Sequence, residues 1–140
     1  MNRLHQILGY AGIFPFFIFS LVYFFSNKEE YSLLLLVAYS GLIFSFLGGL
    51  LWATTLDYEP PKHVLYVSVG TILWSFVWII SCRIPEQFYP FLFVIISSSF
   101  IALHCYERIY LSTIYSKTFL RLRMYLSLSV TSILLLVAFI

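Results

Sequence analysis

The residues from Ser32 to Thr54 read SLLLLVAYSGLIFSFLGGLLWAT and contain no charged side chain. The hydrocarbon core of a bilayer is about 30 Å thick, and an α-helix needs about 20 consecutive apolar residues to cross it. A backbone exposed to lipid must satisfy its own hydrogen bonds, and this stretch lacks the alternating pattern of barrel strands. The stretch therefore predicts a transmembrane helix, and it decides the fold class.

Four further apolar runs extend this pattern over most of the chain. The 140 residues are 61% apolar and 10% charged, far from the composition of soluble globular domains. Each run ends at charged residues, at prolines or at both. We therefore expect one all-α domain over residues 1–140, an integral membrane bundle of five transmembrane helices at about 7–26, 32–54, 64–82, 88–106 and 122–140.

The basic residues of the loops predict the orientation of the bundle. With five spans, one side holds six of the eight Lys and Arg residues, and the positive-inside rule makes that side cytoplasmic. We therefore expect the N-terminus and a basic loop at 107–121 in the cytoplasm, and the C-terminus outside. The six are Arg3, Lys62, Arg108, Lys117, Arg121 and Arg123, and the other two are Lys28 and Arg83.

Small residues recur along the second span at Gly41, Ser45 and Gly49, with Gly48 beside them. Small residues at this spacing let two helix backbones approach closely, and such packing drives helix association in lipid. Packing against another helix of the same chain is favoured over a seam between two copies. Pro15 removes a backbone donor in the middle of the first span and predicts a kink there.

Four side chains are candidates for lining a cavity or facing a ligand: Ser45, Trp74, His104 and Glu107. The indole N–H of Trp74 lies mid-span and needs a hydroxyl or carbonyl partner. His104 and Glu107 share a helix face, where they can hydrogen-bond, titrate near neutral pH or offer two metal ligands. The plainer alternatives are core packing for Trp74 and an interfacial pairing of His104 and Glu107, with Arg108 or another basic residue of the loop. One such pair does not make a metal site, so no metal, cofactor or catalytic residue is predicted.

The basic loop intersperses its charges with apolar side chains, which is typical of a helix lying on the inner leaflet. Each basic group near an anionic membrane surface contributes about 1 kcal/mol. The expected partners are therefore membrane lipids, with a second copy or another membrane protein as further options and with no nucleic acid. The residues expected to contact lipid headgroups are Arg108, Lys117, Arg121 and Arg123.

Three segments resemble the signature of a small family of uncharacterised multi-pass membrane proteins, shared by proteobacterial inner-membrane proteins and a mitochondrial transmembrane relative. They are GYAGIFPF at 9–16, YSGLIFSFLGGLLWA at 39–53, and residues 115–126 with their LRLR motif. The family often has a histidine where this chain has Leu51, and an aspartate in the region of Glu107. The resemblance implies a multi-pass protein of the bacterial inner (cytoplasmic) membrane, since no transit segment is found, and it brings no catalytic residues.

Two functional classes stay open. A transport or permeability protein that maintains ion balance would use the kink at Pro15, the glycine-rich second span and Trp74 to shape a path. Carboxylates and lysines normally mark proton and sodium relays, and the spans as predicted lack them, which counts against a conventional coupled carrier. A non-enzymatic accessory or scaffold subunit, packed against a larger membrane complex or lipid, needs no buried charge. An enzyme is not expected, because no nucleophile–base pair, metal triad or pair of carboxylates occurs at a useful spacing.

Overall fold

The computed structural model describes residues 3–25 and 30–139. Within these residues every regular element is helical, and five segments are long and apolar enough to cross a membrane. This confirms the predicted all-α fold with five spans. Two 3₁₀ turns, η1 (Ser81–Arg83) and η2 (Glu86–Phe88), join the third span to the fourth. The α-helices are α1 (Arg3–Ala11), α2 (Phe14–Phe25), α3 (Glu30–Asp57), α4 (His63–Ile80), α5 (Tyr89–Tyr110) and α6 (Lys117–Phe139).

The first span consists of α1 and α2, and it is broken close to the proline that predicted a kink. Pro15 has no N–H to donate to the carbonyl of Ala11, and its ring excludes that carbonyl from a regular helical turn. Accordingly, α1 ends at Ala11 and α2 begins at Phe14. The hydroxyl of Tyr39 on α3 donates to the carbonyl of Gly12 at 2.7 Å, so the break is bonded to the second span.

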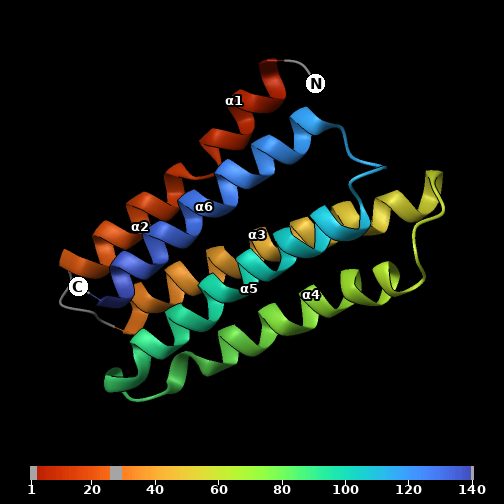
Figure 1. Cartoon of the computed structure of the whole chain (residues 1–140). Helices are drawn as coiled ribbons and strands as arrows, with labels where there is room; N and C mark the ends of the chain where they lie inside the picture. The colour runs from red at the N-terminus through yellow and green to blue at the C-terminus, as the bar shows by residue number, and fades with distance from the viewer. Residues whose placement is uncertain (1–2, 26–29, 140) are drawn as a thin grey trace.

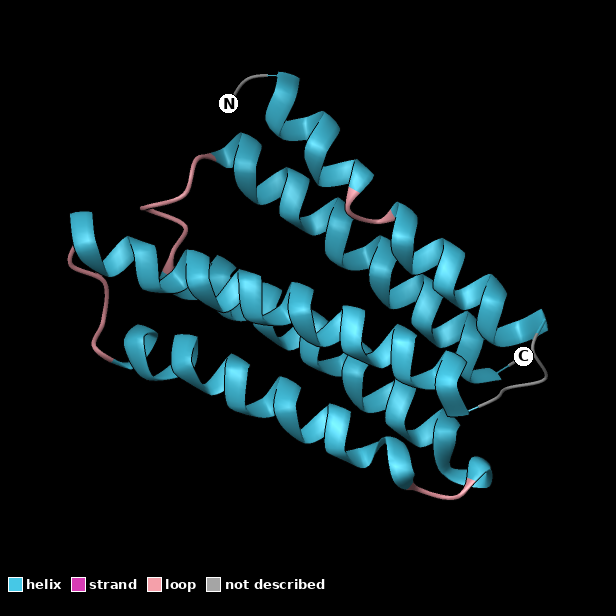
Figure 2. Ribbon diagram, turned by 180° about the vertical axis from the view of Figure 1, so that it is seen from behind, coloured by secondary structure: helices cyan, strands magenta, loops and turns pink. Residues whose placement is uncertain are grey.

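The spans alternate in direction, so the start of α1 and the end of α6 lie at opposite ends of the bundle (Figure 1). Helix α3 packs along α4, α5 packs along α6, and the first span contacts α6 and α3. Seen from behind, α4 and the first span form the two outer margins (Figure 2). The fold is therefore two helical hairpins, with the first span laid over one side of them.

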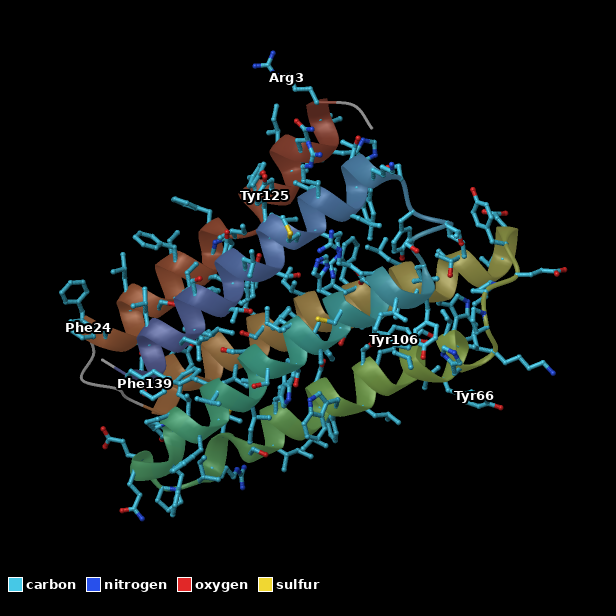
Figure 3. The ribbon with its side chains drawn as sticks, in the orientation of Figure 1. Arg3, Phe24, Tyr66, Tyr106, Tyr125 and Phe139 are labelled. Atoms are coloured by element: carbon cyan, nitrogen blue, oxygen red, sulfur yellow. The ribbon has the colours of Figure 1, made fainter. Side chains whose placement is uncertain are left out.

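Aromatic rings fill the space between the two hairpins. The ring of Phe44 on α3 lies 4.9 Å from Trp78 on α4 and 5.4 Å from Phe100 on α5, measured between centroids. Other large apolar side chains face outward, as Phe24 and Tyr66 do at the margins of the molecule (Figure 3). An apolar exterior around a packed aromatic interior is what a bundle in lipid requires.

The small residues of α3 are used within the chain, against α4. A Cβ atom added at Gly48 would overlap Oγ1 of Thr71 and lie 2.7 Å from the carbonyl oxygen of Ser68. At Gly41 it would lie 3.3 Å from the nearest side chain of α4, whereas at Gly49 it would meet nothing within 4 Å. Gly41 and Gly48 therefore form the seam, and the expectation that Gly49 packs against another helix of the chain is wrong because it faces away from α4.

Candidate functional site

The last turns of α5 and the second turn of α6 carry a buried ion pair. Arg123 donates from Nη2 to Oε1 of Glu107 at 2.9 Å and from Nε to Oε2 at 3.1 Å. Glu107 is 1% exposed and Arg123 is 5% exposed. Two parallel N–H···O bonds hold the guanidinium and the carboxylate in a fixed relative geometry. Because the two charges cancel, the pair can be retained inside a membrane bundle, where a lone charge would be strongly unfavourable.

Two further polar side chains border this pair. Arg123 also donates from Nη1 to the hydroxyl oxygen of Ser127 at 3.4 Å. His104 lies one turn before Glu107, and its Nδ1 is 3.9 Å from Oε2 of that carboxylate. His104 is 6% exposed, and within the described part of the chain neither of its ring nitrogens has a hydrogen-bond partner. The cluster therefore contains a buried imidazole that can accept a proton or bind a ligand beside a carboxylate.

The connection between α5 and α6 lies against this cluster. Leu111 is fully buried, and its N–H donates to the carbonyl oxygen of Glu107 at 2.9 Å. The hydroxyl of Ser116 accepts the N–H of Phe119 at 3.1 Å and so caps the start of α6. Burial, reinforced by the negative charge of Glu107, raises the pKa of Tyr115 to about 12. The hydroxyl of Tyr115 therefore stays protonated at neutral pH and remains a hydrogen-bond donor.

A cavity of about 170 Å³ lies beside the ion pair, between the first span and helices α3, α5 and α6. Arg123 and Ser127 form its polar wall, and the other lining residues are apolar or glycine. Gly9 and Gly12 line it at the break of the first span. A Cβ atom at Gly9 would lie 3.3 Å from Cδ1 of Leu126, so the absent side chain lets the first span approach α6 closely.

The structure brings together only some of the residues proposed from the sequence. His104 and Glu107 lie side by side, as their spacing predicts. Trp74 donates from Nε1 to the hydroxyl of Ser99 at 2.8 Å, which confirms the expected hydroxyl partner, but it lines a separate groove between α4 and α5. Ser45 is half-buried on α3 and lies outside both the groove and the cavity beside the ion pair.

The expected headgroup contact of Arg123 is wrong, because this side chain is buried and bound to Glu107. Helix α5 runs to Tyr110 and α6 begins at Lys117, so the connection is shorter than the expected loop at 107–121. Both charges of the pair consequently lie within spans. The other three residues of the set are exposed, and their contact with headgroups stays a prediction: Arg108, Lys117 and Arg121.

The sequence does contain a signal for the inward position of Arg123. Arg123, Ser127, Val130 and Leu134 follow one another at intervals of four, three and four residues, and all four are buried. This is the spacing of one face of a helix. Arg121 falls outside that stripe and is exposed. The expected span at 122–140 already contains Arg123, and the phase of this stripe assigns its side chain to the bundle interior.

A family model described as "Protein of unknown function (DUF3429)" matches residues 1–139 of the chain. No curated protein and no solved structure matches the chain. The matched region includes all five spans and both partners of the buried ion pair.

Proposed function

We propose that this chain, which belongs to the DUF3429 family of proteins of unknown function, is a small transport or permeability protein acting on ion balance across a membrane. The observation that carries the proposal is the cluster of His104, Glu107 and Arg123, buried between two spans. Ionisable side chains within spans are unfavourable to insert, face the bundle interior and mark ion or proton pathways. The sequence had counted against a carrier because the spans were taken to be free of charge, and the buried pair removes that objection.

The arrangement of the cluster suits the uptake of a proton or a small ion. The imidazole of His104 has two nitrogens without partners in the described residues, and Nδ1 lies 3.9 Å from a carboxylate oxygen of Glu107. A proton taken up by the imidazole can therefore reach the carboxylate after a small movement of the ring. The cavity beside Arg123 measures about 170 Å³. A buried water needs about two to four polar partners, and Arg123 and Ser127 offer them on one wall, so this cavity can hold water against the ion pair.

An accessory or scaffold role ranks second. Such a role needs a docking face for a larger membrane complex, and small-residue stripes such as that of α3 suit close helix contacts. In the structure Gly41 and Gly48 of this stripe already face α4, so the seam is occupied within the chain. Docking would have to use other lipid-facing side chains.

The proposal places the protein in the bacterial inner membrane, with its N-terminus in the cytoplasm and without an enzymatic reaction. The orientation is supported by the alternation of the spans, which gathers most of the basic residues at the end of the bundle where α1 begins (Figure 1). The bacterial location rests on the resemblance of the sequence to inner-membrane proteins.

Flux measurements on purified protein in sealed liposomes test the transport proposal. The wild-type protein should raise the flux of protons or of a monovalent ion above that of empty liposomes. His104→Leu should fold with an unchanged thermal midpoint in detergent and should return the flux to the empty-liposome level. Cys105→Leu is the matched control, because Cys105 is the next residue along α5 and is exposed. Its flux should equal that of the wild type.

The proposal is abandoned if wild-type liposomes match empty ones for protons, sodium, potassium and chloride at several pH values. If the wild type and His104→Leu gave equal flux above that of empty liposomes, the transport proposal would stand, but the cluster would not lie on the transport path. Crosslinking in native membranes distinguishes the accessory role from transport. The accessory role predicts a crosslink to a defined partner protein, together with no flux in liposomes.

A further inference from the structure

A groove of about 360 Å³ separates α4 from α5. The two helices touch across it mainly through long side chains, whereas each packs closely against its other neighbour. Figure 3 shows Tyr106 on the side of α5 that faces α4. The groove is lined by side chains of both helices, among them Val67, Gly70 and Trp74 of α4 and Ser99, Leu103 and Tyr106 of α5.

Polar atoms along the groove are satisfied by the protein itself. Trp74 donates from Nε1 to the hydroxyl oxygen of Ser99, and Ser99 donates in turn to the carbonyl of Ile95, both at 2.8 Å. The hydroxyl of Thr71 donates to the carbonyl of Ser68, also at 2.8 Å. A polar ligand would lose its hydrogen bonds to water on entering and would find these groups already engaged. The groove therefore suits an apolar occupant.

The groove is shorter than one membrane leaflet. Its lining residues run from Val67 to Trp74 on α4 and from Ser99 to Tyr106 on α5, seven residue steps on each helix, which corresponds to about 10 Å at a helical rise of 1.5 Å per residue. The hydrocarbon core of a bilayer is about 30 Å thick, so the groove lies within one leaflet, with Tyr106 toward the start of α4. Part of one phospholipid acyl chain fills this length, whereas a spanning helix of a partner protein is about three times as long.

The open end of the groove carries side chains suited to the headgroup region. His63 Nδ1 is hydrogen-bonded to the hydroxyl of Tyr106, and the ring of His63 lies 4.5 Å from that of Tyr110. Rings with polar edges favour this depth in a membrane. Lys62 precedes His63 in the chain and is exposed, so it places a positive charge where a lipid phosphate would lie.

Gly70 keeps the groove open without contributing to the packing of the bundle. A Cβ atom added there would meet nothing within 4 Å. A Cβ atom added at Gly48 of α3, which faces the other side of α4, would overlap Thr71. A larger side chain at Gly70 would therefore fill the groove and leave the helix contacts intact.

We propose that the groove between α4 and α5 binds one acyl chain of a phospholipid from the leaflet at the His63 end, with the phosphate of its headgroup beside Lys62. This site is independent of the proposed transport function, because neither His104 nor Glu107 lines the groove.

Lipid retention and photocrosslinking test the site. The full chain is reconstituted with a phosphatidylglycerol that carries a photoactivatable diazirine in the middle of one acyl chain. One sample is washed with increasing detergent and counted for bound phospholipid by native mass spectrometry. A second sample is irradiated, and the crosslinked peptides are identified.

The wild type should retain one phospholipid through washing, and its crosslinks should fall in α4 and α5. Gly70→Leu should reduce retention at least fivefold. Ala102→Phe, at an exposed residue that also lines the groove, should do the same if Gly70→Leu folds poorly. Gly49→Leu is the matched control, because its Cβ also lies in open space but outside the groove, and it should retain the lipid.

Three results would overturn the proposal. Retention by the folded Gly70→Leu and Ala102→Phe variants at the wild-type level would show that the groove is not the site. Crosslinks spread evenly over the outer faces of all the helices would show unspecific annular lipid. Chain-to-chain or protein-to-protein crosslinks through α4 and α5, with no retained lipid, would show that a second copy or another protein occupies the groove.

Discussion

Helices α4 and α5 are each closely packed on one side and held apart on the side where they face one another. The closely packed side of each helix is called its closed side. On its closed side α4 meets α3 at Gly48, where the two backbones are so close that a Cβ atom has no room. On its closed side α5 meets α6 through the ion pair of Glu107 and Arg123. Between α4 and α5 a hydrogen bond from Trp74 to Ser99 spans a groove instead. In a membrane, where all apolar side chains have equally apolar surroundings, small residues and paired charges determine which helices come together.

The largest expected effect breaks the closed side of α5. Glu107→Gln leaves the charge of Arg123 buried without a counterion, and breaking a buried pair in this way destabilises by about 3–5 kcal/mol. We expect a matching loss of unfolding free energy, measured by titration with a denaturing detergent.

The double variant Glu107→Leu with Arg123→Leu provides the control, because it removes both charges together. It should recover most of the lost stability, since apolar replacements of a buried pair are often neutral or stabilising. A double variant as unstable as Glu107→Gln would contradict the view that the unpaired charge causes the loss.

The closed side of α4 should respond next. Gly48→Ala places a methyl group against Thr71 and the carbonyl of Ser68, and forced overpacking costs about 1–3 kcal/mol. Gly41→Ala is the matched control, since the nearest atom lies at 3.3 Å and belongs to the side chain of Ser75. Thermal midpoints in detergent should fall clearly for Gly48→Ala and little for Gly41→Ala, and the reverse order would refute the proposed seam.

A smaller effect is expected across the open side. Trp74→Phe removes the N–H that donates to Ser99, and one such hydrogen bond contributes about 1 kcal/mol. The unfolding free energy should fall by about that amount. Because the ring is 42% exposed, little buried apolar area is lost with it. A loss as large as that of Glu107→Gln would mean that α4 and α5 depend on this contact as strongly as on their closed sides.

The smallest effect should be a gain. Gly49→Ala and Gly70→Ala each place a methyl group in open space on a helix, where alanine is favoured over glycine by about 0.5–1 kcal/mol. Both variants should raise the thermal midpoint slightly. A drop for Gly49→Ala would restore the original expectation that this glycine belongs to the seam.

The number of spans could be predicted because each one is a long apolar run such as 32–54, and run length is a local property of the sequence. The break near Pro15 was predictable for the same reason, since proline acts on the turn that precedes it. The phase of the small-residue stripe was not predictable in this way. Gly48 and Gly49 are adjacent and chemically identical, and only the position of α4 determines which of them is packed.

The ion pair shows the same limit at the candidate site. The sequence placed His104 and Glu107 on one face because both lie on one helix. Arg123 lies on another helix. Its partner depends on where α5 ends, on where α6 begins and on how the two helices are rotated relative to each other. With the last span expected to begin at residue 122, Arg123 fell in its first turn, at the membrane surface, whereas α6 begins at Lys117. Helix boundaries are the least reliable part of a sequence-based prediction, and here one boundary determined the site.

The hydroxyl of Tyr39 that reaches the carbonyl of Gly12 also bears on how the protein is assembled. A carbonyl without a partner in lipid is unfavourable by several kcal/mol, and the break in the first span makes such a carbonyl. The first span therefore enters the membrane with a defect that the second span repairs. Pairing of the first two spans therefore removes the cost of this carbonyl and couples the position of the break to that of α3.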